Sequence, residues 1–286
     1  NRSDTGAIGA DETIVGQGLT ESGVYTVRLS VKDYASNNNT PYVFTFTASR
    51  ADSSIEMERN NEITSANVMR GETVRGRIYP EGDVDFFTYI VGEDPRFVTV
   101  RLVPPDNVNA RMHLFDAAGE KMFEIDNAET GMAEIIPAVF AEGRIFVQVE
   151  AFAGEIDADK YYTLSVEPSA YQDNVEIEPN DEKEQATLLS DGIMYGFSTF
   201  HGDTDFYLLE TEDRQEVSFR ITGAPGASST VSVTDNLGYI INSYPVEGEE
   251  IVEFTELVNR RAYLKVDAQR ENYTQPYIIE TFTQGQ

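Results

Sequence analysis

Two short acidic motifs hold the residues of this chain that are best suited to bind a ligand. The first motif is Glu-x-Glu-x-Asn, the second is a Gly-Asp-x-Asp turn, and each occurs twice. In the later copy the candidate residues are Glu176, Glu178, Asn180, Asp181, Asp203 and Asp205. In the earlier copy they are Glu56, Glu58, Asn60, Asp83 and Asp85.

The chemistry that these residue types favour is the binding of a hard cation. In an extended segment residues i, i+2 and i+4 share a face, so both glutamates and the asparagine project together. If the acidic turn meets them, four carboxylates and one amide oxygen converge, and such charges cost stability unless a cation neutralises them. Six to eight oxygen ligands suit Ca²⁺ better than Mg²⁺. The later copy is favoured, because Asp181 adds a carboxylate where the earlier copy has Asn61.

Zinc is disfavoured, because the only histidines, His113 and His201, lie far apart in the sequence and there is no cysteine. A simpler interpretation of the motifs also exists. Glu-x-Glu-x-Asn could be a solvated linker whose asparagine caps a helical turn before Ala66 or Ala186. Gly-Asp-x-Asp could be an ordinary hairpin turn. The joint recurrence of both motifs at one spacing favours the cation site.

The motifs belong to an internal repeat of domain size. The spacing is 120 positions, for example from Glu56 to Glu176 and from Asp83 to Asp203, and it needs no gap between the two motifs. We therefore divide the chain into three parts. Residues 1–50 are the C-terminal half of a first β-sandwich repeat, residues 51–169 are the second repeat, and residues 170–286 are the third.

The elements that must position the motifs are predicted to be strands. The second repeat contains eight short runs with strand patterns, separated by turn residues such as Glu81-Gly82 and Glu142-Gly143. Val98, Val100 and Leu102 alternate with polar residues, which predicts one solvated face. The third repeat has the same pattern with a few deletions. We therefore expect an all-β fold of tandem antiparallel β-sandwich (jelly-roll-like) domains.

Residues 1–50 repeat only the later strands of a module. Segments 23–30 and 41–47 have strand patterns, and the spacing of 120 matches Val27 to Val147 and Tyr42 to Tyr162. The half that would carry the acidic motifs is not in the sequence. We expect this part to be either a remnant of a larger precursor or a half-module completed by strands from a neighbour.

The composition limits the partners. Asp and Glu number 50 against 21 Lys and Arg, for a net charge of -29, so nucleic acid and anionic membrane surfaces are not expected partners. No apolar run approaches the roughly 18 residues of a membrane span, so membrane insertion is not expected. The sequence has no Gly-x-Ser-x-Gly, His-Glu-x-x-His or phosphate-binding glycine loop, so we do not expect an enzyme.

The acidic motifs, with the later Tyr162-Thr-Leu-Ser-Val166, resemble the bacterial pre-peptidase C-terminal (PPC) domain family, which is similar to the collagen-binding domains of clostridial collagenases. The resemblance covers both full repeats and the half repeat. It implies a jelly-roll-like sandwich, secretion and no catalysis of its own. It also implies that linker acids and the acidic turn hold Ca²⁺, at the candidate residues named above. Collagen binding does not carry over.

Three functions remain open on the sequence. The first is a non-catalytic secreted, cell-surface or periplasmic protein of tandem calcium-binding modules, with a structural, adhesive or targeting role toward an extracellular protein or polysaccharide. The second is a subunit of an extracellular filament or surface layer, which self-associates through strand complementation of residues 1–50. The third is the C-terminal targeting region of a secreted hydrolase.

Overall fold

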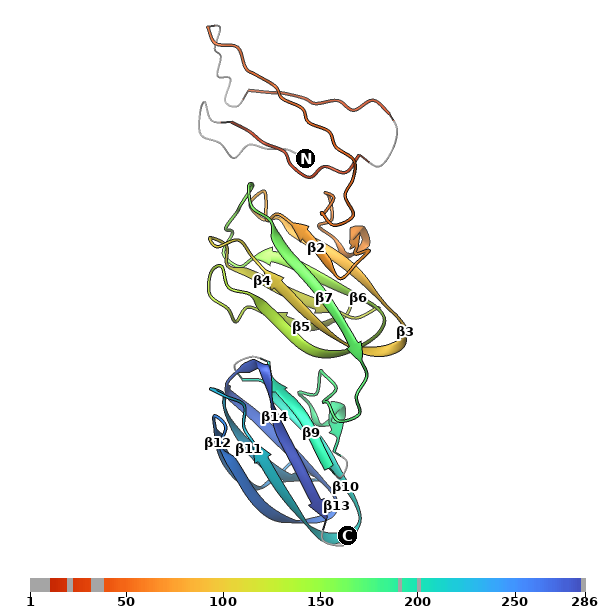
Figure 1. The fold of residues 1–286 in the computed structure, drawn as a ribbon, viewed down its shortest axis with the longest axis vertical. Coiled ribbons are helices and arrows are strands. Elements are labelled where there is room, and N and C mark those ends of the chain that lie inside the picture. Colours follow the sequence, from red (N-terminus) through yellow and green to blue (C-terminus); the bar gives the residue numbers. More distant parts are fainter. Residues whose placement is uncertain (1–10, 20–22, 32–38, 190–191, 200–201, 284–286) are drawn as a thin grey trace.

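A computed structural model describes residues 11–19, 23–31, 39–189, 192–199 and 202–283 of the chain. An amino-terminal segment is followed by two β-sandwich modules, which we call module 2 and module 3 after the predicted repeats (Figure 1). Each module is built from one mainly antiparallel seven-stranded sheet that folds over itself. Helix in the described residues is limited to two 3₁₀ turns of three residues each. The prediction of tandem all-β sandwich domains is confirmed.

The elements of the two modules follow the same order in the chain. Module 2 contains η1 (Ile63–Ser65), β1 (Asn67–Val68), β2 (Thr73–Gly76), β3 (Val84–Val103), β4 (Ala110–Phe115), β5 (Lys121–Ile125), β6 (Glu134–Ala151) and β7 (Tyr162–Ala170). Module 3 contains η2 (Lys183–Gln185), β8 (Thr187–Leu188), β9 (Gly192–Ser198), β10 (Thr204–Thr222), β11 (Ser228–Asp235), β12 (Ile240–Glu247), β13 (Ile251–Arg270) and β14 (Asn272–Thr283).

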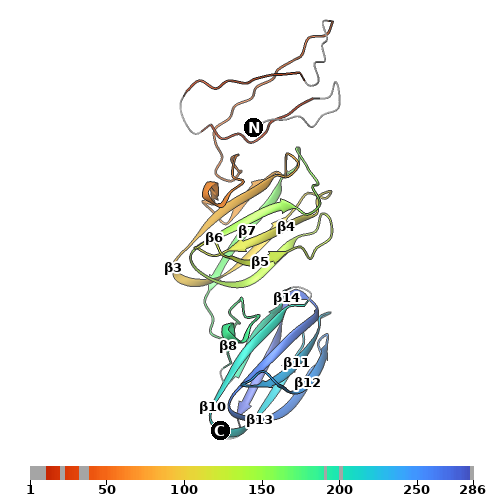
Figure 2. The same cartoon turned by 180° about the vertical axis from the view of Figure 1, so that it is seen from behind.

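The sheet orders of the modules correspond strand by strand. Module 2 has the order β2-β7-β3-β6-β4-β5, and module 3 has β12-β11-β13-β10-β14-β9, which is the same path in reverse. In each module one further short strand, β1 or β8, pairs in parallel with the first long strand. Figure 2 shows from behind how the long strands β3 and β6 curve through module 2.

The count of eight short strands in the second repeat was wrong. Predicted strands at 85–91 and 97–103 are two arms of the single bent strand β3, and those at 133–136 and 144–150 are arms of β6. The predicted turn at Glu142-Gly143 is a bend inside β6, where Gly143 has φ 68°. Register shifts on β3 around Gly92 absorb the bend. A bulge keeps the ladder paired on both sides while the strand changes direction, so the sequence pattern resembles two strands and a turn.

The core of each module lies inside the folded sheet. Val98, Val100 and Leu102 are fully buried in module 2, while Arg101 between them is exposed, so the alternation predicted for this strand is confirmed. Phe219 and Ile221 occupy matching places in module 3. Burying a side chain of this kind contributes roughly 1.5–3 kcal/mol. The two separate cores are what holds the strands that carry the acidic motifs.

The amino-terminal segment contains no strand among its described residues. Residues 23–30 and 41–47, predicted as strands, are drawn as extended chain and form no strand in the part of the chain that the structure describes (Figure 1). The physical reason is that their partner strands would come from the other half of a module, and an isolated pair of strands buries too little surface to be stable. His201, which we weighed as a metal ligand, lies outside the described residues. In the described part of the chain no helix is long and apolar enough to cross a membrane.

Candidate metal centre

The Glu-x-Glu-x-Asn motif is an extended linker held along the edge of the module that follows it. In module 2 the Glu56 amide donates to the Arg75 carbonyl of β2 over 2.9 Å, and in module 3 the Glu176 amide donates to the Tyr195 carbonyl of β9 over 3.0 Å. The extended backbone makes alternate side chains point inward. Glu56, Glu58 and Asn60 are buried, while Met57 and Arg59 between them are exposed.

This burial excludes the solvated-linker interpretation. The predicted helical turn does exist in both copies, but its N-cap residues are Glu62 and Glu182 and not the asparagines. Asn60 and Asn180 are instead fully buried. The prediction that both glutamates and the asparagine share one face is confirmed.

The acidic turn brings the aspartates to the same place. In module 2 Gly82 has φ 77°, a conformation that favours glycine, and the turn leads straight into β3. The Tyr79 amide donates to Asp83 Oδ2 over 3.0 Å. In module 3 the matching Thr199 amide donates to Asp203 Oδ2 over 2.6 Å. The Asn60 and Asn180 carbonyls accept the amides of Phe86 and Phe206, which ties linker and turn together.

The carboxylates of each module converge into one buried cluster. In module 2, carboxylate oxygens of Glu58, Asp83 and Asp85 all lie within 4.8 Å of one another. In module 3 the same holds for Glu176, Glu178 and Asp205. Ten of the eleven predicted residues are buried at linker or turn positions of the two modules. They are Glu56, Glu58, Asn60, Asp83, Asp85, Glu176, Glu178, Asn180, Asp203 and Asp205.

The remaining predicted residue, Asp181, differs in its position. It is exposed and lies outside the set of converging oxygens, and its carboxylate accepts a hydrogen bond from the Thr204 amide. The extra carboxylate that favoured the later copy therefore borders the cluster. Asn61, its counterpart, donates to Asp83 Oδ1 over 3.2 Å and supports the cluster from outside.

Tyrosine hydroxyls complete the clusters, and sequence reasoning placed these rings only in the core. Tyr162 donates to Asp85 Oδ2 over 2.7 Å, and its counterpart Tyr277 donates to Asp205 Oδ2 over 2.5 Å. Module 3 has a second phenol, Tyr207, which donates to Glu176 Oε2 over 2.5 Å, where module 2 has Phe87. A tyrosine at a repeated strand position was the available signal, because a buried phenol needs a hydrogen-bond partner.

Several buried polar atoms in the clusters have no hydrogen-bond partner. They are Asn60 Oδ1, Asn60 Nδ2, Asp85 Oδ1 and Glu178 Oε1. Leaving such an atom buried and unpaired costs about 1–3 kcal/mol, and more when it is charged. The orphaned oxygens are the type of ligand that a hard cation takes, so the residues present fit Ca²⁺.

The Asn180 amide gives a second test of the fit. One of its two outer atoms lies 3.2 Å from Asp205 Oδ1 and 2.9 Å from Glu178 Oε2. With nitrogen at this position the amide donates to both carboxylates. With oxygen there, three oxygens meet, and either a proton on one of the carboxyls or a cation must lie between them. Rotation of the Asn180 amide by half a turn therefore exchanges a donor to the carboxylates for an oxygen that can bind a cation.

Burial dominates the electrostatics of the clusters. It raises the pKa of Glu56 and of Glu176 to about 8, that of Glu58 to about 7 and that of Asp83 to about 6. Burial, with repulsion from neighbouring carboxylates, also raises the pKa of Asp85, Glu178 and Asp205 well above its usual range. Each cluster thus favours either protons or a bound cation at neutral pH.

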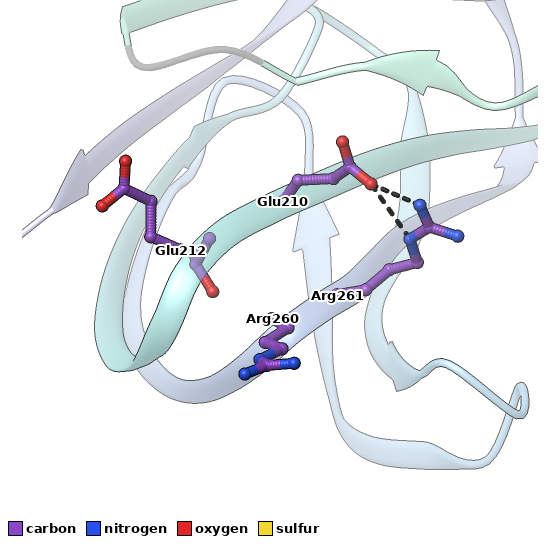
Figure 3. Close-up of a pocket in the computed structure, with 5 residues that line it drawn as sticks. Glu210, Glu212, Arg260 and Arg261 are labelled. Atoms are coloured by element: carbon purple, nitrogen blue, oxygen red, sulfur yellow. Dashed lines mark hydrogen bonds and ion pairs between the residues drawn. The ribbon is translucent and has the colours of Figure 1, made fainter.

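Two hollows differ in their relation to the clusters. One is lined by Glu58, Asn61 and Asp83 among others, and it leads from solvent to the cluster of module 2. The other lies at the bend between β10 and β13, where Arg261 forms an exposed ion pair with Glu210 beside Glu212 and Arg260 (Figure 3). An exposed pair of this kind contributes about 0–1 kcal/mol. Only the first hollow offers an entry path for an ion.

Each cluster also lies at the junction with the preceding part of the chain. The backbone of Glu58 accepts from the Gly18 amide over 3.0 Å and donates to the Gly16 carbonyl over 2.8 Å. Glu178 forms the matching parallel bridge to Val139 on β6 of module 2. The linkers of both junctions are therefore bound on two sides, by their own module and by the one before it.

The junction between modules 2 and 3 has further contacts. Linker residue Tyr171 stacks on Phe97 with a centroid separation of 5.5 Å and packs edge-on against Phe140 at 5.7 Å. In the loop between β5 and β6, Asn127 Nδ2 donates to the Thr199 carbonyl over 3.1 Å. At the first junction the Tyr79 hydroxyl donates to the Thr13 carbonyl over 3.2 Å. Tyr79 and Thr199 occupy equivalent positions, so this position contacts the preceding part of the chain at both junctions, as a donor at the first and as an acceptor at the second.

Comparison with known proteins adds little. No protein-family model matches the chain, and no curated protein matches it. Among solved structures, the CUB1-EGF-CUB2 domains of human MASP-1/3 are 7 % identical, with a TM-score of 0.24, over 74 % of this chain and 100 % of that chain. A candidate secreted protein from Eubacterium rectale is 7 % identical, with a TM-score of 0.26, over 74 % and 73 % of the two chains. At these TM-scores neither similarity carries an argument.

Proposed function

We propose that this protein is a non-catalytic string of calcium-binding β-sandwich modules that acts outside the cell, and that calcium stiffens the junctions between its modules. The proposal has two parts, the identity of the ion and the mechanical role of the site. It keeps the resemblance to the PPC domain family as its family-level interpretation.

The donor set supports calcium. The clusters offer carboxylate and amide oxygens, with neither sulfur nor imidazole among their described residues. Hard cations with flexible coordination prefer such ligands, and Ca²⁺ accepts more of them than Mg²⁺. Extracellular modules typically bind Ca²⁺ with dissociation constants of about 0.1–1 mM. A site of this affinity is filled where calcium is millimolar, which supports an extracellular location.

The observation that carries the mechanical role is the double attachment of Glu58 and Glu178. The side chain of each belongs to the cluster of its own module, whereas its backbone pairs with the part of the chain before it. Without a cation, repulsion among buried carboxylates favours release of the linker. With a cation the linker is fixed, and the preceding module is fixed with it. Calcium would thus convert a hinged chain into a rigid one.

The direct test is a titration with Tb³⁺, which replaces Ca²⁺ and is sensitised by nearby tyrosine. The chain has no tryptophan, so the signal would come from Tyr162, Tyr207 and Tyr277, whose hydroxyls contact the carboxylates. We expect two ions per chain, displaced by Ca²⁺ and not by equal Mg²⁺. A site at 100 times its dissociation constant should add about 2.7 kcal/mol of stability.

The mechanical part has its own measurement. The chain has no cysteine, so a pair of introduced cysteines on exposed strands of modules 2 and 3 can carry spin labels uniquely. We expect a narrow distance distribution with Ca²⁺ and a broad one with EDTA. Binding of Tb³⁺ with no change in the distance distribution would leave the calcium site standing and remove its mechanical role.

A further inference from the structure

The amino-terminal segment carries side chains of a module core that nothing in the described structure covers. Val27, Leu29, Tyr42, Phe44 and Phe46 are exposed by 54, 57, 79, 52 and 66 %. Their counterparts at the spacing of 120 are Val147, Val149, Tyr162, Leu164 and Val166, and each of these is 0 % exposed. Five positions that are fully buried in a complete module are therefore open in this segment.

Module 2 shows what covers such positions. The strand that holds Val147 pairs with β3 on one side and β4 on the other, and β7 pairs with β2 and β3. All three covering strands come from the first half of the module. Module 3 repeats the arrangement with β9, β10 and β11 around β13 and β14. Modules 2 and 3 thus show which three strands pair with the later strands of a complete module.

The segment also sits on module 2 as a complete module would. Residues 16–18 bind the linker at Glu58 as residues 138–140 of module 2 meet the linker at Glu178. The backbone is left-handed at both contacts, with φ 70° at Gly16 and 49° at Ala138. A spacing of 122 relates Gln17 to Val139, the two residues that form these bridges.

From these observations we propose that residues 11–50 are half of a first β-sandwich module, which is completed by a polypeptide segment equivalent to residues 51–122. The occupant supplies three apolar strands, and it also brings its own Glu-x-Glu-x-Asn and Gly-Asp-x-Asp motifs. Tyr42 then takes the place that Tyr162 has beside Asp85, so the completed module holds a third cation site. This last part rests on the proposed calcium function, whereas the strand completion does not.

The test is a chimera in which residues 51–122 are duplicated ahead of Asn1, with the natural chain as reference. Hydrogen exchange reports strand completion. In the natural chain we expect amides 23–31 and 41–47 to exchange close to the unfolded rate, and in the chimera to slow by more than about a hundredfold, since paired core strands exchange only on opening. The matched control carries Phe87→Asp and Val100→Asp in the duplicated copy only, and it should not slow exchange.

Three outcomes decide the proposal. The first outcome is protection of both segments together with one more bound Tb³⁺ per chain. If Tyr42→Phe abolishes binding of this additional ion or lowers its emission, both parts of the proposal are supported. Protection without an additional ion retains the completed module and removes its cation site. Exchange in the chimera as fast as in the natural chain, while modules 2 and 3 stay protected, overturns the proposal.

A second measurement covers a chimera that fails to fold. The open face of the natural chain should bind the dye ANS, and Phe44→Ser with Phe46→Ser should remove most of that signal, because ANS reports exposed apolar surface. Leu237→Ser, on an exposed loop of module 3, is the control. A natural chain that is monomeric, binds no ANS and protects amides 23–31 would show that the segment covers its own core, and this also overturns the proposal.

Discussion

The side-chain amide of Asn127 in module 2 donates a 3.1 Å hydrogen bond to the backbone carbonyl of Thr199 in module 3. Thr199 in turn directs its own amide to Asp203 on the acidic turn over 2.6 Å. One residue therefore connects the preceding module to the candidate metal centre. Tyr79 does the same at the first junction, through Thr13 and Asp83. The position of a cluster and the position of a neighbouring module are linked by short backbone contacts.

Neutralising one ligand should have opposite effects with and without calcium. Asp205→Asn removes a buried charge that burial and neighbouring carboxylates disfavour, so module 3 should melt higher in EDTA at pH 8. In saturating Ca²⁺ the same variant should melt lower than the natural chain, by several degrees, because the ligand is lost. Asp85→Asn is the matched change in module 2. Calorimetry with and without EDTA checks both, and equal effects in the two conditions would contradict the ligand role.

The metal-free chain should lose stability as the pH rises. The pKa values of Glu58, Asp83 and Glu176 are raised by burial to about 7, about 6 and about 8, above the ordinary carboxyl range of about 4 that applies in the unfolded chain. Because the pKa is higher in the folded state, each of these carboxyls contributes to the free energy of unfolding in full below pH 4. That contribution is lost as the pH passes through 6 to 8. Urea unfolding in EDTA at pH 5, 6.5 and 8 measures this fall.

Calcium should remove that pH dependence. The ion binds the ionised carboxylates, so its affinity rises over the range in which the metal-free chain weakens. We expect the free energy of unfolding in saturating Ca²⁺ to be nearly constant from pH 6.5 to 8. A metal-free chain that is as stable at pH 8 as at pH 5 would mean that the clusters are not as strongly desolvated as their burial indicates.

The phenol at the repeated strand position should contribute to ion binding. Tyr277→Phe removes the hydroxyl that donates to Asp205, and a hydrogen bond to a charged group contributes about 1.5–3 kcal/mol. We expect the Ca²⁺ affinity of module 3 to fall by roughly tenfold or more, and Tb³⁺ emission to fall with it. Tyr239→Phe, at an exposed position of module 3, is the control and should retain binding. Isothermal titration separates affinity from brightness.

The second junction should depend on its aromatic contact. Tyr171→Ala removes the ring that stacks between linker and module, at 5.5 Å from Phe97. We expect the distance distribution between spin labels on modules 2 and 3 to broaden in the presence of Ca²⁺, while the number of bound Tb³⁺ ions stays the same. Leu237→Ala, exposed on module 3, should leave the distribution unchanged. A loss of ion binding in Tyr171→Ala would mean that the ring supports the cluster itself.

The sequence determined the repeat, the fold class and most of the candidate site. Regular spacing showed that two modules carry the same motifs, and strand alternation placed Glu56, Glu58 and Asn60 on one face. These properties depend on local backbone geometry, which a periodic pattern encodes directly. The same reasoning divided β3 and β6 into separate strands, because a bulge inside a strand and a turn between strands use the same residues.

Only the tertiary structure decided which polar groups meet. It brought Tyr162 and Tyr277 to the carboxylates from strands about a hundred residues further along the chain, and it placed Asp181 at the border of its cluster, where it accepts from the Thr204 amide. It also paired Glu58 and Glu178 with the part of the chain before them. Contacts of this kind follow from how two sheet arms pack and how one module rests on another, and neither is encoded in the local pattern of residues. For that reason the sequence predicted a cation site, and the fold placed the candidate ligands at a junction.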